Sequence, residues 1–431
     1  MESLWKATCR MPEFPTLEGE KSTDVLIIGA GITGILTAYF LHQKGVDCIL
    51  VEKGRLCSST TENTTAKITV QHGLVYSKLI KNFGTETAAA YLKANQNAFS
   101  KYEELFKTTK CDSEVKDNYV YSLNDRQKLE NEIKALEKIG YYTDICESTE
   151  LPFATVGAVR FKNQMQFHPL KFLSQICEGL NIYENTFVDD VKDNTAETPR
   201  GNIHAKAIVF ATHFPFKDNH GGYPLKLYQH RSYVIAVENG KDVNGMYVDE
   251  NHKGMSFRNY KDLLLIGGGG HRTGKQGGCW KELRDFANHN FPESKEVYHW
   301  AAQDCMSLDD CCYIGRYSKS KTNWYTATGF NKWGMTGAML SAMMMSDMVC
   351  DEQNEFESVF TPSRSILRPQ LFINGIETVA NLLSITPKRC SHLGCALKWN
   401  EAEHSWDCAC HGSRFNEKGE VLNNPANKEI I

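Results

Sequence analysis

The first fifty residues alternate between short apolar runs and one helix-like pattern. Val25 to Ile28 form an apolar run that suits a buried parallel strand, and Asp47 to Val51 form a second one. Between them, from Ile35 to Gln43, apolar residues recur every three or four positions, which is the period of a helix. Gly45 then marks the end of that helix. This order predicts a strand–helix–strand unit built on a parallel sheet.

Three glycines occupy the turn between the first strand and the helix. Gly29, Gly31 and Gly34 have the spacing G-x-G-x-x-G, and Glu52 follows the second strand. In such a turn the first glycine permits the bend, the second lets the backbone approach a pyrophosphate, and the third lets helix and strand pack closely. The helix start attracts phosphate, and the acid accepts hydrogen bonds from a ribose. The pattern predicts a dinucleotide site.

Later segments complete the pattern of apolar and polar positions. Ser232–Glu238 and Gly245–Glu250 alternate like half-buried strands, and Leu79–Glu137 is rich in helical periodicity. Gly337–Val349 is shorter than the roughly 18 apolar residues of a membrane-spanning helix, so we expect a buried helix there. The glycine-rich segment Leu263–Gly278 lacks the third glycine, the helix and the final acid of a nucleotide motif. We therefore expect a single nucleotide.

Composition and charge narrow the class of protein. The 431 residues allow two or three domains, and 41% hydrophobic and 23% charged residues are ordinary for a globular protein. The net charge of -4 comes without a basic stripe, so we expect no nucleic-acid partner. The N-terminus lacks the apolar core of a secretory signal, and most of the 15 cysteines are scattered without disulfide-like spacing. These features predict a cytoplasmic protein without a membrane span.

Roughly the first 360 residues resemble the D-amino-acid oxidase family, the flavoproteins that include glycine oxidase and sarcosine oxidase. The resemblance rests on the glycine motif with Glu52 and on the segments Cys57–Gly73, Ala207–Phe216, Asp304–Tyr317 and Tyr325–Met339. It implies an α/β fold in which a Rossmann-type FAD-binding domain carries a mixed-sheet substrate domain. Beyond the motif itself, the implied FAD contacts are Lys53, Thr65, Ala66, Lys67, Ala211, Gly329, Gly334, Met335 and Thr336.

The same resemblance suggests roles in catalysis. In that family the last segment brings a helix start to the pyrimidine edge of the flavin, where Lys332 could also stabilise negative charge. Arg258 could clamp a substrate carboxylate in a bidentate pair. Lys332, Arg258 and His271 are the catalytic candidates, and His72, His168 and Tyr233 are further substrate-facing candidates; each also fits as an ordinary polar residue. Cys305 resembles the flavin-attaching cysteine of sarcosine oxidases, but it lies closer to Asp309 than that family's pattern has it.

A second concentration of chemistry lies near the C-terminus. Cys390–Phe415 contains four cysteines and three histidines within 26 residues. Cys390 and His392 form C-x-H, and Cys408 and His411 form C-x-x-H, with 15 residues between His392 and Cys408. Two thiolates and two imidazoles could hold a structural zinc ion. Each pair offers one sulfur and one nitrogen, which also suits an iron–sulfur cluster.

This stretch closely resembles the Rieske [2Fe–2S] signature. Carried over, the resemblance implies that Cys390 and Cys408 bind one iron, that His392 and His411 bind the other, and that Cys395 and Cys410 form a disulfide. Zinc stays the alternative. Two neutral histidines in place of thiolates raise the potential of such a cluster to about -150 to +300 mV, and the cluster accepts one electron at a time.

Together these patterns predict three parts of the chain. Residues 1–360 form the flavoprotein, with FAD-binding parts at about 20–80, 180–216 and 303–350 and a substrate domain at about 81–179 and 217–302. Residues 361–382 form a linker that is irregular up to about Gln370 and is followed by a helix-like stretch over Glu377–Leu383. Residues 383–431 form an abbreviated, small all-β Rieske domain without the strand-rich base usual before the first ligand. A unit this small needs staples. We therefore expect it to pack on the flavoprotein and to unfold when its cluster is lost.

The combination predicts a function in electron transfer. A small amine or amino acid would deliver a hydride to FAD, and single electrons would leave through the cluster to an external one-electron carrier. Reduction of an unsaturated substrate in the opposite direction and a non-enzymatic redox sensor or electron shuttle are alternatives. A Rieske oxygenase would need two histidines and a carboxylate around one iron, and Asp218, His220 and His230 lack the close spacing.

Overall fold

A computed structural model describes residues 2–217, 220–384 and 386–430 of the protein. A largely parallel sheet forms one half of it. Its strands follow the order β16-β17-β10-β1-β2-β7, and β8 and β9 extend β10. The bounds are β1 Lys21–Ile28, β2 Cys48–Val51, β7 Ile182–Tyr183, β8 Asp190–Lys192, β9 Thr195–Glu197, β10 Ile203–Phe210, β16 Tyr313–Ser318 and β17 Lys321–Thr328. Strands β7, β2, β1, β10 and β17 run parallel, as buried apolar runs favour.

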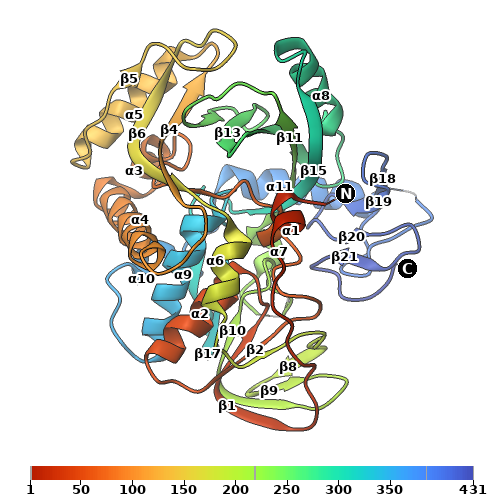
Figure 1. Cartoon of the computed structure of the whole chain (residues 1–431). Coiled ribbons are helices and arrows are strands. Elements are labelled where there is room, and N and C mark those ends of the chain that lie inside the picture. The colour runs from red at the N-terminus through yellow and green to blue at the C-terminus, as the bar shows by residue number, and fades with distance from the viewer. Residues whose placement is uncertain (1, 218–219, 385, 431) are drawn as a thin grey trace.

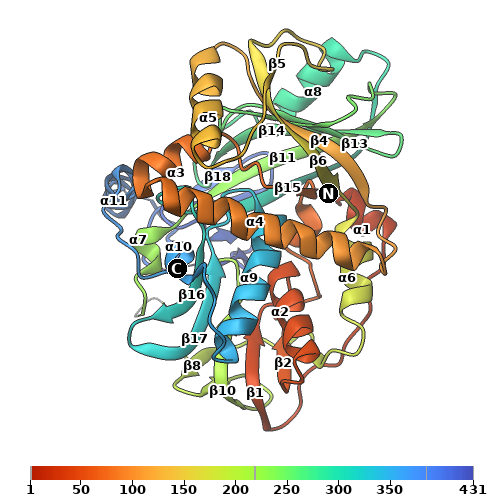
Figure 2. The ribbon, with the colours of Figure 1, turned by 90° about the vertical axis from the view of Figure 1, so that its left-hand side faces the viewer.

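Two apolar helices cover this sheet. α2 (Ile32–Gln43) follows the glycine turn, and α9 (Gly334–Val349) packs against it. α9 is almost entirely buried, as predicted for Gly337–Val349. α4 (Thr85–Phe106) crosses over α9, as Figure 2 shows.

A mixed sheet lies above the first sheet in Figure 1. Its order is β15-β11-β14-β13-β12-β4-β6-β3, and β5 pairs with β6. The bounds are β3 Lys67–Ile68, β4 Glu114–Ser122, β5 Ile145–Cys146, β6 Gly157–Gln166, β11 Tyr228–Glu238, β12 Met246–Asp249, β13 Ser256–Tyr260, β14 Leu263–Arg272 and β15 Lys295–Met306. The strands predicted at 232–238 and 245–250 are present as β11 and β12.

Short helices surround the two sheets. They are α1 Leu4–Thr8, η1 Thr61–Asn63, α3 Tyr76–Phe83, α5 Arg126–Lys138, α6 Pro169–Ile176, α7 Tyr223–Lys226, α8 Cys279–Asn290 and α10 Glu357–Phe360. α8 packs on β14 and β11, while α3 packs on α4 and α5. Within the three described ranges, none of the helices has both the length and the apolar character that crossing a bilayer requires.

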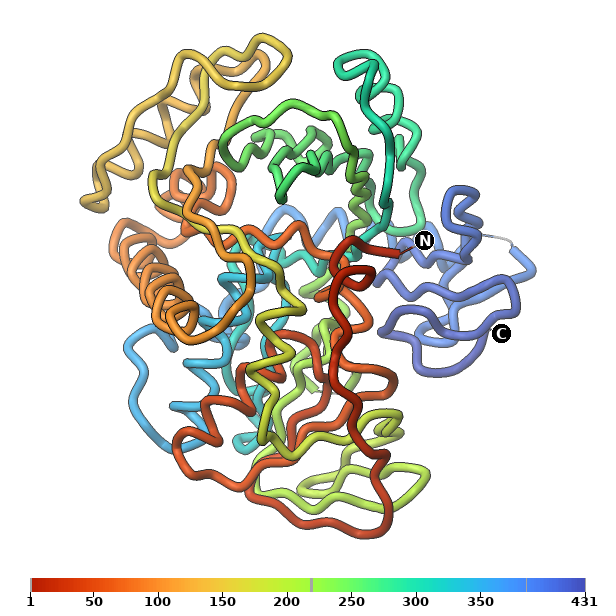
Figure 3. Tube along the Cα trace, viewed as in Figure 1, coloured from red at the N-terminus to blue at the C-terminus, as the bar shows by residue number. Residues whose placement is uncertain are grey.

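The C-terminal residues form a small lobe at one side of the molecule (Figures 1 and 3). Four antiparallel strands follow in order: β18 Leu397–Asn400, β19 Ser405–Cys408, β20 Arg414–Phe415 and β21 Val421–Asn423. Leu397, Phe415 and Ala426 form a core of their own with the lobe's four cysteines. The mixed α/β architecture with a small all-β lobe confirms the predicted fold class.

The segment before the lobe contains the helix predicted over Glu377–Leu383, but that helix begins earlier than expected. Helix α11 spans Pro369–Leu383. Pro369 is favourable at a helix start because a backbone N–H at that position would have no hydrogen-bond partner within the helix, so its absence costs nothing. Asn374 and Asn381 are buried on the helix side that faces the protein, and Nη1 of Arg272 donates to Oδ1 of Asn374 at 2.8 Å. These polar contacts are long-range, so the local pattern could not predict them.

Candidate functional site

The glycine turn has the close packing that its spacing predicts. Gly29 has φ +104°, and a Cβ atom there would lie 2.7 Å from the carbonyl oxygen of Ala211. A Cβ on Gly34 would lie 1.9 Å from the carbonyl oxygen of Gly29. Gly31 caps α2 and lines the cavity described below. Only glycine fits the first and third positions, so the start of α2 stays open to an approaching phosphate group.

The acid after β2 is held at the same place. Oε2 of Glu52 accepts from the N–H of Ala30 at 2.9 Å, and Oε1 accepts from the N–H of Gly54 at 3.1 Å. The side chain lines the cavity beside Gly29 and Gly31. Since each carboxylate oxygen can accept more than one hydrogen bond, Glu52 can also accept from ribose hydroxyls.

A cavity of about 1620 Å³ runs along the glycine turn and on between the two sheets. Among the residues predicted to contact FAD, those that line it besides Gly29, Gly31 and Glu52 are Lys53, Thr65, Lys67, Ala211, Gly334 and Met335. The others lie behind its wall: Gly34, Ala66, Gly329 and Thr336. Thr336, for example, ties the start of α9 to β3 because its hydroxyl lies 2.8 Å from the carbonyl oxygen of Thr69. A dinucleotide fits this elongated, mixed-polarity space.

The three catalytic candidates occupy different places. Lys332 lines the cavity next to the start of α9, whereas Arg258 and His271 do not line it. The guanidinium of Arg258 is fully buried, donates to the carbonyl oxygen of Ala66 at 2.7 Å and lies 5.3 Å from the ring of Trp5. His271 lies 3.0 Å from the hydroxyl of Tyr233, at the side of the C-terminal lobe. The structure therefore brings only Lys332 to the cavity.

The remaining candidates also separate. His72 lines the cavity but is fixed between the hydroxyl of Tyr91, at 2.6 Å, and the carbonyl oxygen of Thr69. Burial lowers the pKa of His72 to about 4, so its ring is neutral. His168 caps α6. Tyr233 lines the cavity.

Two other considered sites do not form around their proposed residues. The thiol of Cys305 is buried, accepts from the hydroxyl of Thr328 at 3.4 Å and does not line the cavity. Of the oxygenase-type iron ligands, Asp218 lies outside the described residues. His220 packs on Trp324 of the parallel sheet, whereas His230 lies on β11 of the other sheet. The two histidines therefore do not share a site.

An acid–amine pair in the cavity was missed by the sequence reasoning. Asp304 and Lys332 both line the cavity, and each is an electrostatic neighbour of the other. Burial raises the pKa of Asp304 and lowers that of Lys332, while their opposite charges counteract both shifts. Oδ2 of Asp304 also accepts from the hydroxyl of Ser232 at 3.1 Å. The pair offers both a negative and a positive group to a ligand.

Lys67 provides a second unusual amine on the cavity wall. It lies on β3, close to the guanidinium of Arg258. Burial, together with that guanidinium, lowers the pKa of Lys67 to about 7. At neutral pH its amine can therefore gain or lose a proton.

The C-terminal lobe gathers the predicted metal ligands. Cys390 and Cys408 are each 1% exposed, and the ring centroids of His392 and His411 lie 5.1 Å apart. A hydrogen bond between the two thiols lowers the pKa of Cys390 and raises that of Cys408. Cys395 and Cys410 form a disulfide, the pair that the resemblance implies. Two sulfurs and two imidazoles thus lie at one end of the lobe.

The protonation state of these groups fits metal ligation. Burial lowers the pKa of His411 to about 3, so its imidazole is neutral. Its buried Nδ1 atom has no hydrogen-bond partner among the described residues. Neutral imidazole nitrogen and thiolate sulfur are the donors that a Rieske cluster requires. The loops bend back at Gly394 and Gly412, whose φ angles of +73° and +85° favour glycine.

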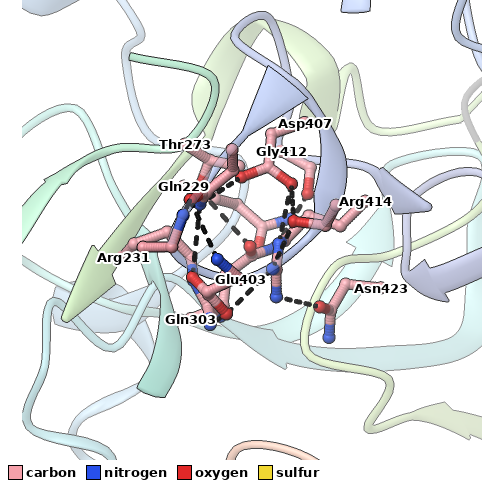
Figure 4. Close-up of polar contacts among 12 residues, drawn as sticks. Gln229, Arg231, Thr273, Gln303, Glu403, Asp407, Gly412, Arg414 and Asn423 are labelled. Carbon is pink, nitrogen blue, oxygen red and sulfur yellow. Dashed lines mark hydrogen bonds and ion pairs between the residues drawn. The ribbon is translucent and has the colours of Figure 1, made fainter. Parts of the chain in front are cut away.

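The ligand loop of His411 is docked on the flavoprotein through backbone carbonyls. Nε2 of Gln229 donates to the carbonyl oxygen of His411 at 2.9 Å, and Nε2 of Gln303 donates to that of Gly412 at 2.8 Å (Figure 4). The guanidinium of Arg272 donates to the carbonyl oxygens of Ala409 and Cys410. Because these contacts surround the loop, its position relative to the cavity is fixed.

A single short segment links the cavity to both histidines. Ala211, Thr212 and His213 line the cavity directly after β10. The next residue, Phe214, is fully buried, and its ring centroid lies 6.3 Å from that of His392 and 6.4 Å from that of His411. The wall of the nucleotide cavity and the metal ligands are thus neighbours.

A buried charge network also joins the lobe to the flavoprotein (Figure 4). The side chain of Glu403 is 1% exposed and pairs with Arg231 of β11 and Arg414 of β20. Nε of Arg231 donates to Oε1 of Glu403 at 2.9 Å, and Nε of Arg414 donates to Oδ1 of Asp407 at 2.9 Å. Glu403 and Arg414 line the cavity together with residues of the lobe's last segment. The lobe is therefore part of the cavity wall.

Two family models match the chain, one over the part with the two large sheets and one over the C-terminal lobe. A model of FAD dependent oxidoreductases (DAO) matches residues 24–348, and a model of the Rieske [2Fe-2S] domain matches residues 374–431. The chain belongs to the DAO family of FAD-dependent oxidoreductases. The first match covers the glycine turn, most of both sheets and the cavity wall apart from its N-terminal and lobe residues, and the Rieske match covers the lobe and most of α11.

One relative matches the whole chain, and others match only a short segment of it. The chain is similar to YhfW of Bacillus subtilis (strain 168), whose name describes a Rieske 2Fe-2S iron-sulfur protein. The two are 34% identical over 492 aligned positions, which cover 100% of this chain and 97% of YhfW. Across 37 residues, 9% of this chain and 16% of the other, the chain is 51% identical to the chloroplastic cytochrome b6-f complex iron-sulfur subunit of Fritillaria agrestis.

Solved structures show the same fold for the flavoprotein. Glycine oxidase from Geobacillus kaustophilus matches 80% of this chain and 99% of its own with a TM-score of 0.68 and 18% identity. L-proline dehydrogenase from P. horikoshii matches 81% of this chain and 98% of its own, with a TM-score of 0.67 and 15% identity. These likenesses concern the fold.

The cofactors follow from the family and fit the residues present. The oxidoreductase uses FAD, for which the glycine turn, Glu52 and the cavity provide a site, and a Rieske [2Fe–2S] cluster. The orphaned Nδ1 atom of His411 and the paired thiols fit the cluster. The alternative of a structural zinc site is replaced by this finding.

Proposed function

We propose that the oxidoreductase dehydrogenates a small amine or amino acid and passes the electrons singly, through its Rieske lobe, to an external one-electron carrier. FAD supplies the hydride acceptor: the substrate loses one hydride from carbon and one proton from nitrogen, which leaves an imine. The two electrons then leave in two single steps, and the carrier is reduced twice per substrate. The supporting observation is the fixed position of the His411 loop beside the cavity wall.

The chain's own residues support the choice of substrate class. Asp304 could bind the ammonium group of an amino acid, and Lys332 could bind its carboxylate, since both line the cavity. Lys67, whose pKa is lowered to about 7 by burial and by Arg258, could accept the proton that the nitrogen loses.

Phe214 and the two glutamines have positioning roles in this proposal. The buried Phe214 ring, next to the cavity-lining residues after β10, packs on both histidines. Gln229 and Gln303 hold the His411 loop in one place. A fixed position of the loop favours transfer of single electrons without movement of the lobe.

We also propose a cytoplasmic location. Apart from the cluster ligands Cys390 and Cys408 and the disulfide pair Cys395 and Cys410, the cysteines are free thiols. Free thiols in this number suit a reducing compartment.

Anaerobic titration with a panel of amines and amino acids tests the substrate class. We expect at least one compound to bleach the flavin absorbance. Asp304→Asn should then raise the half-saturating concentration at least about tenfold, since a hydrogen bond to a charged group contributes about 1.5–3 kcal/mol. Asp285→Asn, the same change at an exposed position of α8, should behave like the unchanged protein. If a reduced nicotinamide bleaches the flavin and no amine does, electrons flow toward the substrate and the proposal is wrong.

A further inference from the structure

Helix α11 presents its apolar side outward. All of its exposed residues are apolar: Pro369, Phe372, Ile373, Gly375, Ile376, Val379, Ala380, Leu382 and Leu383. Phe372 is 66% exposed, Ile376 70% and Leu383 78%. The polar residues Asn374 and Asn381 are buried against the protein instead. A surface helix normally has the opposite orientation.

Specific polar contacts fix this orientation. Arg272 donates to Asn374, and Nζ of Lys275 lies 2.7 Å from a carboxylate oxygen of Glu377. The carbonyl oxygen of Asn381 accepts from the N–H of Ala396 at 3.0 Å. The helix therefore cannot rotate to bury its apolar side without breaking these bonds. The outward apolar side is a built feature of the fold.

The shape of the apolar side indicates what covers it. At 100° per residue, the exposed positions span about 180° of the helix circumference. A contact with one partner helix uses a narrower stripe of two positions in seven. With 15 residues the helix is about 22 Å long, which is less than the roughly 30 Å of a bilayer core. A broad apolar half-cylinder of this length suits a helix that lies along a membrane surface.

Neighbouring residues enlarge the apolar side. Leu225 of α7, Leu367 and Leu393 are 55%, 75% and 46% exposed. α7 packs against α11, and both lie at the outer edge of the molecule in Figure 2. The guanidinium of Arg389 donates to the carbonyl oxygens of both Leu382 and Gly394, so the end of α11 and the His392 loop are joined. Exposed apolar side chains are therefore present on α7, which contacts α11, and on the His392 loop, which is tied to the end of α11.

Positive charge flanks the apolar side. Arg368 precedes the helix, and Lys388 and Arg389 follow it. Within the described parts of the chain, none of these three side chains pairs with a carboxylate. Arg368 lies over the ring of Phe83 and Lys388 over that of Trp406, while Arg389 donates to backbone carbonyl oxygens. Cations beside a broad apolar side complement a membrane whose headgroups are anionic.

We propose that α11, with Leu225, Leu367 and Leu393, docks the oxidoreductase on the surface of an anionic lipid bilayer. The apolar side chains enter the acyl region, and Arg368, Lys388 and Arg389 contact headgroup phosphates. The His392 loop of the cluster lobe then faces the same surface. This inference does not depend on the substrate or on the direction of electron flow.

Vesicle flotation with the full-length protein, carrying both cofactors, tests the docking. We expect the protein to float with phosphatidylcholine vesicles that contain phosphatidylglycerol, and less with phosphatidylcholine alone. Changing Phe372→Glu and Ile376→Glu together should lower the bound fraction at least about tenfold, because the variant has lost two large apolar side chains whose transfer from water into the acyl region would favour binding. Val115→Glu with Leu123→Glu, exposed apolar residues of the substrate domain, is the matched control and should float unchanged.

Both pairs of residues are exposed, so each variant should fold normally. The visible spectra of FAD and of the cluster check this. The proposal is overturned if the unchanged protein floats with neither kind of vesicle, or if the α11 variant floats as well as the control. It is also overturned if light scattering shows a dimer in solution that the α11 variant dissociates, since a second copy would then cover the helix.

Discussion

Replacing Cys408 with alanine should give a protein that still reduces its FAD with substrate but delivers no electrons to a protein acceptor. Alanine has no sulfur to bind iron, so the cluster should not assemble. Cys408 itself does not line the FAD cavity, and the glycine turn and Glu52, which do, lie outside the lobe, so flavin reduction should persist even where the lobe's own part of the wall is lost. The lobe depends on its cluster and disulfide because its own core is small. Proteolysis should therefore cleave the variant lobe after α11, where the unchanged protein resists.

Three readouts separate the steps in this variant: the EPR signal of the reduced cluster, bleaching of FAD under anaerobic conditions, and reduction of a c-type cytochrome. The matched control is Cys146→Ala, a partly exposed thiol on β5 of the substrate domain, which should leave all three unchanged. Full cytochrome reduction by the Cys408→Ala protein would show that electrons do not pass through the lobe.

Replacing Glu403 with glutamine should weaken the lobe and its docking by about 3 kcal/mol, since removing one partner of a buried ion pair leaves uncompensated charge. Here two guanidinium groups, of Arg231 and Arg414, lose their shared carboxylate. Burial disfavours the charged form of Glu403, but the two arginines outweigh burial and lower its pKa to about 2. The stabilisation is therefore present above the ordinary carboxyl value of 4.5 and is lost as the pH falls toward 2.

Urea unfolding followed by the visible circular dichroism of the cluster measures this effect, with flavin fluorescence reporting the other part of the chain. The lobe transition should move to lower urea in the Glu403→Gln protein, while the flavoprotein transition stays. Glu417→Gln is the control, because Glu417 forms an exposed pair with His404 and should change stability by less than about 0.5 kcal/mol. Equal shifts in the two variants would contradict a special role for the buried network.

Local spacing predicted the two cofactor sites because each depends on residues close in sequence. Gly29, Gly31 and Gly34 lie within one turn, so the spacing that marks the site is local, although Gly29 also packs on the carbonyl oxygen of Ala211, far along the chain. The ligand pairs Cys390 with His392 and Cys408 with His411 are similarly local. Both cofactors could thus be recognised before the structure was known.

The contacts that join the sites could not be predicted in the same way. Gln229, Arg231 and Gln303 belong to the substrate sheet, and their partners in the lobe lie far along the chain. One signal was present: Gln229, Arg231 and Tyr233 occupy alternate positions of β11 and are all buried. Polar residues in that register predict a buried polar interface on one face of a strand.

Residue type and local context alone did not place Arg258 and His271 correctly, because neither side chain lines the cavity. A basic residue in a strand-like context fits a substrate clamp, yet Arg258 meets the ring of Trp5 and the carbonyl oxygen of Ala66. The amphipathic pattern of α11 likewise predicts burial of its apolar side, whereas Arg272 and Lys275 hold its polar side against the protein. Residue type indicates which contacts are possible, and the tertiary fold decides which of them form.

In the proposed function, electrons pass from FAD to the cluster within one chain. The most direct test mixes the oxidised protein rapidly with a reducing substrate in the absence of oxygen, then follows FAD by absorbance and the cluster by freeze-quench EPR. We predict that FAD absorbance falls first and that the EPR signal of the reduced cluster rises afterwards, before any carrier is added. A cluster that stays oxidised while FAD is fully reduced would contradict the account.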